Sequence, residues 1–531
     1  MKINGFKNCI YIIIVIVNLR MLRLTNELEN IIHLDNIYSV QLGIFSDEEI
    51  KNGSVCEILS QVPYDGSEPV PNGLFDQRMG VIEEGRICET CLNRSELCPG
   101  HFAHIELPLP VFHVQFLEYI PKLLRCVCYR CSNILVDKSD PKVLSLLKSK
   151  KGKHRFTAVN ALSMKIKKCQ FNNGCNAIQP TRYFKQAIEK MQDKKTNFLR
   201  FFAEFKSTIE NQGGKELFGS QKKQQQITSE MCYEIFKRIT DEDVEFLGFD
   251  KRYSRPERFI CKVLPVPPPA VRPSIRQENN SRAEDDLTYA LSHIIKTSRT
   301  LRQKIDSGVP REVIESYLGL LQYHVAIFID NTMPGVPQEG HRSGRHLKTI
   351  IERLKGKDGR MRNNIQGKRV DYSARSVISA DPNMDIDEFG IPFEVAMTVT
   401  FPDIVTKYNK DFLMKLVRNG PTKYPGAKSI KKMTYDCFGT PSPCTISLKH
   451  VDVNSIQLQE GDIVNRHLQD GDVCLFNRQP SLHRMSMMGH KVRVLNSLTF
   501  RLNVTDCKPY AADFDGDKLC YSSCLQQVDA I

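Results

Sequence analysis

The chain has 531 residues, enough for about three or four domains, and a globular composition. It carries 74 Lys and Arg against 61 Asp and Glu, a formal net charge of +13, which suggests a polyanionic partner without proving one. The 18 cysteines gather in C-x-x-C pairs, which favours reduced, metal-bound thiolates in an intracellular protein and argues against a secreted disulfide framework.

Residues 1–36 are predicted to form an N-terminal extension. Lys2 and Lys7 precede the apolar run CIYIIIVIV at 9–17, which is similar to the apolar core of a signal peptide. The run is too short to span a bilayer, no small-residue cleavage site follows it, and Met21 offers an alternative start. We therefore expect no targeting function and no membrane partner.

A first cysteine cluster lies within residues 37–135, where short apolar runs alternate with cysteines. Its spacing is C-x2-C-x6-C-x2-H, formed by Cys88, Cys91, Cys98 and His101. Two tight pairs of such ligands can close a tetrahedron around zinc. Four protein ligands leave no open position, so a structural zinc is predicted. His104 is expected to be a surface or packing residue.

A second zinc site is predicted from Cys128 and Cys131, completed by Cys169 and Cys175. This pairing is weaker than the first because the intervening stretch is long. Cys126 is an alternative ligand.

The chain from 136 to about 230 has helical, polar patterning, with the basic run KSKKGKHR at 148–155 and a loop-like stretch at 210–226. The Pro-rich stretch LPVPPPAVRPSI at 264–275 predicts a polyproline-like strut within one fold, with an SH3-type ligand as the alternative. Helical periodicity returns from about 284 to 330.

A basic stripe runs from Arg342 to Arg375, with eleven Lys or Arg residues against three acids. The scarcity of acids weakens the alternative of a solvated helix face. Beyond position 368, alternating apolar patterning predicts β-strands within 369–379, 472–479 and 491–504.

Three aspartates lie one residue apart in KPYAADFDGDKLC, residues 508–520. In an extended stretch, Asp513, Asp515 and Asp517 would share one face, where their charges repel unless a cation offsets the repulsion. A metal site is predicted, with magnesium as the best match for carboxylate oxygens. Gly516 lets the backbone turn tightly enough to bring the three carboxylates together. An EF-hand is excluded because its glycine and glutamate are missing at the sixth and twelfth positions; a solvated acidic turn is the alternative.

Several stretches together resemble the largest subunit of multi-subunit DNA-directed RNA polymerases, most closely the eukaryotic RNA polymerase II type or its relatives in large DNA viruses. The likeness covers about residues 37–517 and thins between 136 and 230. It is carried by CETCLNRSELCPGHFAHIELPLPVFH (88–113), LLRCVCYRC (123–131), LPVPPPAVRPSI, RLKGKDGRMRNNIQGKRVDYSARSVIS (353–379), RNGPTKYPGAK (418–428), HLQDGDVCLFNRQPSLHRMSMM (467–488) and the aspartate triad.

The resemblance implies a mixed α/β multidomain fold. A clamp with helices, small sheets, two zinc sites, a lid and a rudder would span 37–365, and a double-psi β-barrel with the active site would span 366–531. The stripe would grip template DNA and the RNA–DNA hybrid through phosphates. The implied contacts are Lys355, Lys357, Arg360, Arg362, Lys368, Arg369 and Arg375.

The resemblance also implies that the triad holds one catalytic Mg²⁺ and helps to position a second that arrives with the ribonucleoside triphosphate. Arg478 would reach the ribose hydroxyls of the nucleotide, and Pro480 would shape the same pocket. Without the surrounding motif, a surface salt bridge would be the preferred role for Arg478. Ala511 stands where the family has an Asn that helps to sense the sugar.

The implied partners are the second-largest polymerase subunit and smaller subunits. The family pattern is lost from Lys518 onward, and its bridge helix and trigger loop are missing from the 531 residues, so we expect a split-gene product, a fragment or a truncated sequence that cannot polymerise alone. The alternative is a catalytically inactive, zinc-containing nucleic-acid-binding remnant. A stand-alone two-metal nuclease is disfavoured because no further His or carboxylate cluster lies near the triad. The expected location is the nucleus in a cell, and a cytoplasmic factory or virion in a virus.

Overall fold

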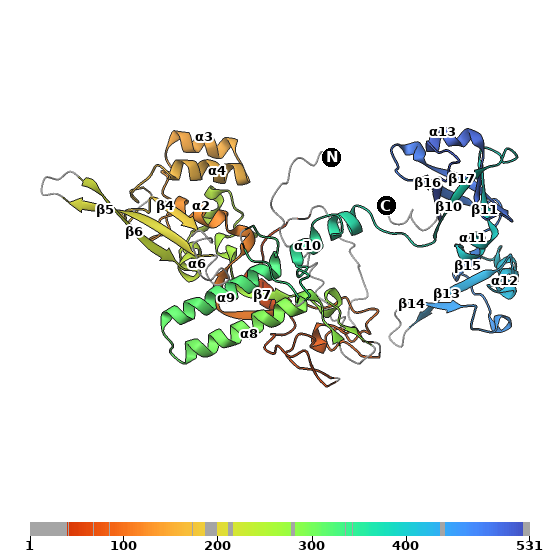
Figure 1. Cartoon of the computed structure of the whole chain (residues 1–531), viewed down its shortest axis with the longest axis horizontal. Helices are drawn as coiled ribbons and strands as arrows, with labels where there is room; N and C mark the ends of the chain where they lie inside the picture. Colours follow the sequence, from red (N-terminus) through yellow and green to blue (C-terminus); the bar gives the residue numbers. More distant parts are fainter. Residues whose placement is uncertain are drawn as a thin grey trace, which may run out of the picture. The chain divides into compact units, whose positions relative to one another are not determined.

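The computed structural model describes residues 40, 42–66, 68–83, 85–171, 174–185, 199–210, 216–277, 282–334, 336–341, 343–435 and 441–523. The predicted N-terminal extension lies outside these ranges. The chain divides into two compact units, Met1–Gln366 (unit 1) and Gly367–Ile531 (unit 2), each with hydrophobic cores of its own (Figure 1). Within the described ranges, no helix is both long and apolar enough to cross a membrane.

Unit 1 contains an antiparallel pair of strands, β3 (Ala103–Phe112) and β7 (Ile260–Val266). The helices α8 (Asp286–Asp306) and α9 (Arg311–Ile329) form a hairpin that packs on β3, which confirms the helical periodicity predicted for about 284–330. Asp285 begins α8 by accepting the N–H of Leu287 at 2.9 Å. The buried faces of these four elements share one hydrophobic core.

A second core of unit 1 joins helices to a three-stranded antiparallel sheet, as Figure 1 shows. Its elements are α2 (Tyr119–Cys126), α4 (Gly152–Ser163), α6 (Ser229–Lys237), α7 (Asp241–Leu247), β4 (Arg182–Lys185), β5 (Phe201–Glu210) and β6 (Glu216–Ile227). The described part of unit 1 also contains α1 (Asp47–Gly53), β1 (Tyr64–Asp65), β2 (Glu68–Pro69), α3 (Pro141–Ser149), β8 (Ile275–Arg276), β9 (Arg282–Ala283) and α10 (Ile350–Leu354), besides short 3-10 and π turns.

The three-stranded sheet corrects two sequence predictions. Helical patterning expected from 136 to about 230 holds for α3, α4 and the start of α6, but 182–185, 201–210 and 216–227 form strands, and the loop expected at 210–226 contains most of β6. Phe201 and Ala203 on β5 are buried two positions apart, and Phe201 lies opposite Ile227 of β6. Burial of one strand face against the helices therefore makes these segments β-strands. Their polar composition gave no sign of this burial in the sequence.

The Pro-rich stretch is part of the folded interior of unit 1. Pro268 and Pro269 are buried, and the fully buried Arg272 donates hydrogen bonds to the carbonyl oxygens of Leu74 (2.5 Å) and Pro267 (3.0 Å). This burial supports the strut interpretation and leaves Pro268 and Pro269 inaccessible to an SH3-type partner.

Unit 2 contains a closed six-stranded barrel, with the strands in the order β10–β18–β11–β17–β16–β19. Their bounds are β10 Ser373–Ala380, β18 Phe500–Leu502, β11 Glu388–Pro392, β17 Met487–Leu495, β16 Val473–Arg478 and β19 Lys518–Ser523. The pairs β10–β18 and β11–β17 are parallel, and the other neighbours are antiparallel. The predicted strands within 369–379, 472–479 and 491–504 are confirmed. Phe389, Phe476 and Phe500 fill the barrel core.

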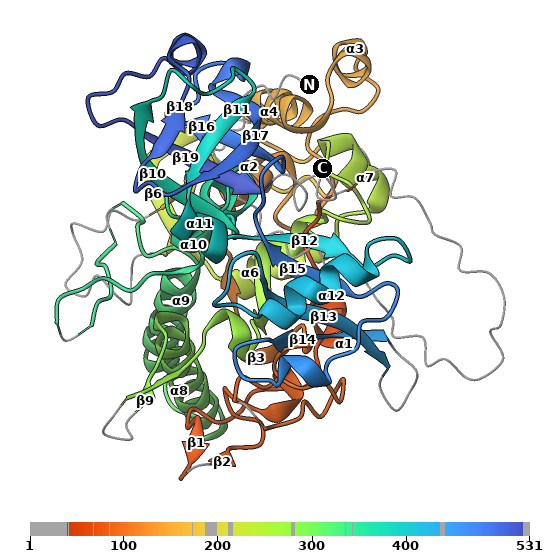
Figure 2. The same cartoon turned by 90° about the vertical axis from the view of Figure 1, so that its right-hand side faces the viewer.

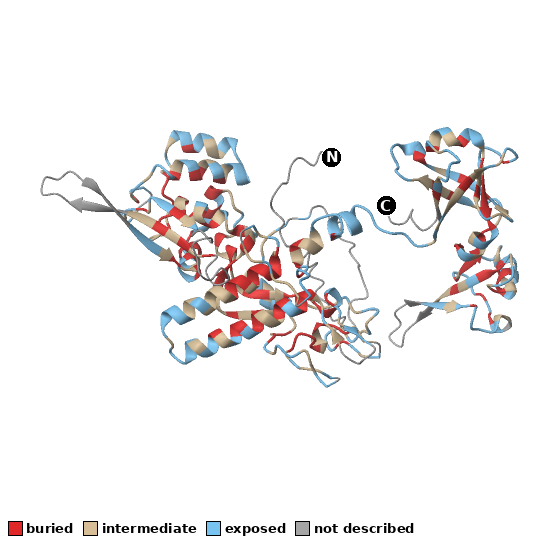
Figure 3. Ribbon diagram, viewed as in Figure 1, coloured by how far each residue is buried: buried red, intermediate tan, exposed pale blue. Residues whose placement is uncertain are grey.

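A four-stranded antiparallel sheet completes unit 2, and helix α12 lies against it (Figure 2). The bounds are β12 Thr400–Ile404, β15 Ile463–His467, β13 Ala427–Tyr435, β14 Pro441–Ser447 and α12 Lys410–Asn419, with α11 (Phe393–Thr398) leading from the barrel. Leu413 and Val417 of α12 pack on Ile430 and Val464 of the sheet. Buried residues therefore gather between α12 and the strands, as Figure 3 shows.

Candidate active site and metal-binding clusters

The aspartate triad lies in the loop between α13 (Cys507–Tyr510) and β19. One carboxylate oxygen from each of Asp513, Asp515 and Asp517 lies within 4.8 Å of the others. The expected extended stretch is wrong, because the backbone bends here and Gly516 adopts φ +119°. Convergence comes from the turn that Gly516 permits, and not from strand alternation.

Arg478 reaches this loop because of sheet register. It ends β16 and lies opposite Leu519 of β19, so its side chain comes beside the residues that precede β19. Its Nε donates to Asp517 Oδ2 at 2.9 Å. The structure thus brings Arg478 to the triad through a salt bridge, the interaction expected of this residue if the surrounding motif is set aside.

The three carboxyl groups differ in their electrostatic surroundings. The hydrogen bond from Arg478 lowers the pKa of Asp517, which also accepts the backbone N–H of Asp513 at 3.2 Å. A shared hydrogen bond and repulsion with Asp515 raise the pKa of Asp513. A divalent cation would relieve this repulsion, and the oxygen donors and exposed edge of the cluster fit Mg²⁺, which keeps positions for water and phosphate.

Two further residues predicted to touch the nucleotide lie on the same segments. Pro480 follows β16 by two residues, after a cis peptide bond with Gln479. Ala511 caps the C-terminus of α13 in the left-handed region, with φ +51° and ψ +40°, and is exposed. Ala511 therefore has a left-handed backbone conformation, which the Asn of the family would adopt more readily than Ala does.

A buried hydrogen bond, which the sequence did not reveal, holds the end of the helix that precedes the triad loop. His490 Nε2 of β17 lies 2.9 Å from the hydroxyl of Tyr510, the last residue of α13. Burial lowers the pKa of His490 and raises the pKa of Tyr510. The two residues are 20 positions apart and belong to no local motif, so only the barrel brings them together.

The first predicted zinc cluster is assembled in unit 1. The ligand atoms of Cys88, Cys91, Cys98 and His101 all lie within 4.8 Å of one another. A tight turn shapes the first pair: the N–H of Leu92 donates to Cys88 O at 2.9 Å, and Leu92 has φ +58°. Burial lowers the pKa of His101, which favours the neutral imidazole that binds metal.

The second predicted cluster is assembled in the same way. Sγ of Cys128 lies 3.6 Å from that of Cys175, and Sγ of Cys131 lies 3.6 Å from that of Cys169. The residue after the second cysteine of each pair, Ser132 or Asn176, again has positive φ (+62° and +56°). The N–H of Ser132 donates to Cys128 O at 2.9 Å, so the two C-x-x-C pairs form the same turn.

Cys126 and His104 lie outside both clusters. The thiol of Cys126 faces Lys122 O at 3.2 Å, and burial raises its pKa to about 11. Nδ1 of His104 is hydrogen-bonded to Ser54 Oγ at 2.5 Å. Cys126 is therefore not the alternative ligand, and His104 is a packing residue.

The basic stripe is strongly exposed where it joins the two units. All seven predicted contacts, Lys355, Lys357, Arg360, Arg362, Lys368, Arg369 and Arg375, are exposed, and so is every residue from 360 to 371. Arg345 and Arg353 instead pair with Asp286 (2.8 Å) and Asp285 (2.5 Å) at the start of α8. Arg342 lies outside the described residues.

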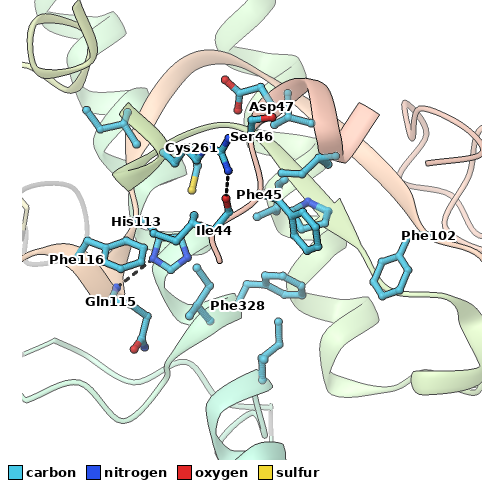
Figure 4. Close-up of a pocket in the computed structure, with 18 of the residues that line it drawn as sticks. Ile44, Phe45, Ser46, Asp47, Phe102, His113, Gln115, Phe116, Cys261 and Phe328 are labelled. Carbon is cyan, nitrogen blue, oxygen red and sulfur yellow. Dashed lines mark hydrogen bonds between the residues drawn. The ribbon is translucent and has the colours of Figure 1, made fainter. Parts of the chain in front are cut away.

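A cavity of about 610 Å³ lies in unit 1, lined by apolar and aromatic side chains such as Phe45, Phe116 and Phe328 (Figure 4). His113 Nδ1 accepts the N–H of Gln115 at 3.2 Å at its wall, and burial lowers the pKa of His113 to about 4. Among the predicted site residues, only Arg360 lines this cavity.

Two family models match this chain, one over nearly all of unit 1 as described and one over most of unit 2. The family model described as RNA polymerase Rpb1, domain 1, matches residues 34–365, and the model for RNA polymerase Rpb1, domain 2, matches residues 367–524. The chain therefore belongs to the family of the largest RNA polymerase subunit.

One curated relative of this chain is named as an RNA polymerase subunit. The chain is 42% identical over 487 residues to the DNA-directed RNA polymerase subunit Rpo1N of Sulfolobus acidocaldarius, an alignment that covers 91% of this chain and 52% of the relative. The chain thus spans about half the length of that relative.

Proposed function

We propose that the chain carries the metal-binding part of the active centre of a DNA-dependent RNA polymerase and acts within a multi-subunit complex. The observation that carries this proposal is the convergence of the three carboxylates beside Arg478 on one loop of a closed barrel. This arrangement does not favour the inactive remnant, because the donor set for a divalent cation is complete.

The triad would hold Mg²⁺ through Asp513, Asp515 and Asp517. When bound there, magnesium would supply the two-metal phosphoryl-transfer chemistry that activates an RNA 3′-hydroxyl and stabilises leaving pyrophosphate. Arg478 holds Asp517 in place and keeps it ionised through the hydrogen bond at 2.9 Å. The guanidinium of Arg478 would also reach the ribose hydroxyls of the nucleotide, and Pro480 would shape the same pocket.

The barrel is proposed to be a double-psi β-barrel. Two parallel pairs, β10–β18 and β11–β17, within an otherwise antiparallel closed sheet support this assignment. The arrangement places β16 and β19 next to each other, which brings Arg478 to the triad loop. The double-psi topology would therefore be the reason that the active-site residues meet.

The stripe is proposed to grip template DNA and the RNA–DNA hybrid. Seven exposed cations with few acids among them can neutralise backbone phosphates without reading sequence, as a polymerase that copies any template requires. The two cysteine clusters are proposed to hold structural zinc, because each offers four ligand atoms within 4.8 Å and no open position. The implied partners are the second-largest subunit, smaller subunits, template DNA and ribonucleoside triphosphates.

The test is Asp515→Asn in the assembled polymerase, with Asp411→Asn on the exposed start of α12 as a matched control. We expect Asp515→Asn to lower nucleotide addition by at least about 10³-fold while assembly and template binding persist, because only metal capture is weakened. The control should keep normal activity. Near-normal nucleotide addition by Asp515→Asn would place the catalytic metal elsewhere.

A further inference from the structure

The triad loop has two separate supports, one at each end. At its end, the carboxylate of Asp517 is held by the guanidinium of Arg478 at 2.9 Å. At its start, Asp513 follows helix α13 after two residues. The N–H of Asp513 donates to Asp517 Oδ2 at 3.2 Å and so links the two ends. The position of Asp513 relative to the other carboxylates therefore depends on how α13 is held.

Helix α13 is only four residues long and has a single buried side chain, Tyr510, which is 1% exposed. The first two residues of the loop are fixed to this helix, because the N–H groups of Ala511 and Ala512 donate to Lys508 O (3.2 Å) and Cys507 O (2.9 Å). A displacement of the tyrosine would therefore move the start of the loop, and with it the first carboxylate of the triad.

His490 of β17 is the hydrogen-bond partner of Tyr510, with Nε2 at 2.9 Å from the hydroxyl oxygen. The imidazole is 5% exposed and contacts two rings of the barrel core, Phe389 (ring centroids 5.8 Å apart) and Phe476 (5.9 Å apart). Side chains packed this closely keep one rotamer. His490 therefore offers the tyrosine hydroxyl a partner whose position is set by the barrel.

The surroundings of His490 make this hydrogen bond important to the ring. Burial lowers the pKa of His490, whereas the charge of Asp506 and the backbone of Ile386 raise it. Among the described residues, Nδ1 of His490 has no partner of ordinary hydrogen-bond geometry, and neither has Oδ2 of Asp506. Loss of the tyrosine hydroxyl would leave Nε2 buried and unpaired as well, which is unfavourable.

We infer that His490 and Tyr510 are positioning residues of the metal site, because their hydrogen bond fixes the end of α13 and so holds Asp513 near Asp515 and Asp517. This inference rests on the magnesium site of the proposed function. Neither His490 nor Tyr510 belongs to the set of metal donors, and both act through the loop. Loss of the hydrogen bond should therefore weaken metal capture even where the barrel stays folded.

The experiment measures the affinity of the full chain for Mn²⁺, which suits carboxylate sites, by electron paramagnetic resonance of the free ion. Tyr510→Phe and His490→Leu should each raise the dissociation constant of the triad site roughly tenfold, the lower end of the effect of residues that support metal ligands. His490→Gln should stay within about twofold of the parent, because an amide can donate to or accept from the tyrosine hydroxyl. Asp515→Asn defines the part of the signal that belongs to the triad.

A double variant separates positioning of the loop from packing of the barrel. Tyr510→Phe alone leaves a buried nitrogen unpaired, whereas His490→Leu with Tyr510→Phe removes both polar groups. Hydrogen-exchange protection of the β16 and β17 amides should therefore return toward that of the parent in the double variant. Its dissociation constant for Mn²⁺ should stay raised. Recovery of Mn²⁺ affinity together with protection would overturn the inference.

Phe500→Leu is the control for general destabilisation, because Phe500 packs on Phe389 and Phe476 in the same core and leaves the hydrogen bond in place. It should lower protection without changing the affinity for Mn²⁺. Equal weakening in this control would mean that barrel stability alone sets the affinity, and would refute the positioning role.

The Asp515→Asn variant distinguishes failure of this inference from failure of the proposed function. If Asp515→Asn lowers Mn²⁺ binding but Tyr510→Phe leaves it unchanged, the metal site stands and the positioning role is refuted. If Asp515→Asn leaves Mn²⁺ binding unchanged, the metal site is refuted and the positioning role with it.

Discussion

The left-handed conformation of Ala511 allows a sharp test of the active-site loop. At φ +51° and ψ +40°, the Cβ crowds the following carbonyl oxygen, which costs a residue other than Gly roughly 1 to 2 kcal/mol. Asn adopts this region more readily because its short polar side chain can hydrogen-bond locally. Ala511 is exposed, so a substitution there changes the backbone energy with little effect on packing.

Ala511→Asn should therefore stabilise the barrel by about 0.5 to 1 kcal/mol. Ala511→Gly also removes the steric strain, but the greater freedom of Gly in the unfolded chain offsets roughly 0.5 to 1 kcal/mol, so it should gain less. Native-state hydrogen exchange of the β16 and β19 amides measures the effect, as a roughly two- to fivefold rise in protection for Ala511→Asn. Lys508→Asn, the same new residue within α13, is the control and should show no gain.

Ala511→Asn and Ala511→Gly also distinguish an effect on backbone strain from an effect on recognition of the nucleotide sugar. An Asn amide that the bound nucleotide covers would be left unpaired by the deoxy analogue, so Ala511→Asn in the assembled enzyme should widen the ratio of kcat/KM for ribonucleotides over deoxynucleotides by roughly fivefold to a hundredfold. Ala511→Gly should leave that ratio unchanged. Equal protection in all variants would refute the strain argument, and an unchanged ratio in Ala511→Asn would refute a sugar contact at this position.

Cys131→Ser should lower the zinc content of the purified chain by about one ion, measured by metal analysis, whereas Cys126→Ser should keep it, because Cys126 lies outside the cluster; equal zinc in both would contradict the ligand set. The pKa of His113 is about 4 when folded and near 6.5 when unfolded, so the unfolded chain binds more protons between these values and stability falls as the pH drops from 6.5 to 4. His113→Gln should remove roughly 2 to 3 kcal/mol of this pH dependence, measured against the parent chain by hydrogen exchange of β3 at pH 7 and 4.5, and an unaltered pH profile would show that His113 is not its source. Lys368→Glu with Arg369→Glu should lower the slope of log K against log salt for RNA–DNA hybrid binding by roughly one for each phosphate that is no longer neutralised, with equal effect on different sequences. An unchanged slope would show that the stripe does not bind the hybrid.

Local patterns in the sequence were sufficient to predict many of the strands and helices and most of the candidate metal ligands. Spacings of two residues predicted the pairs Cys88–Cys91, Cys98–His101 and Cys128–Cys131, because a tight turn brings positions i and i+3 together wherever it occurs. Strand alternation predicted β10, β16, β17 and β18, and helical periodicity predicted α8 and α9, because both depend on neighbours in the chain. The triad itself was visible because three like charges so close together require compensation.

Only the tertiary structure decided which distant residues meet. Cys128 and Cys175 are 47 positions apart, and Arg478 and Asp517 are 39 apart; their contacts follow from how the cluster folds and from the register of β16 on β19. The turn at Gly516, rather than an extended stretch, brings the carboxylates together. Sheet register is set by the burial of whole strand faces and not by any short segment, so the site residues that depend on it could not be paired from the sequence alone.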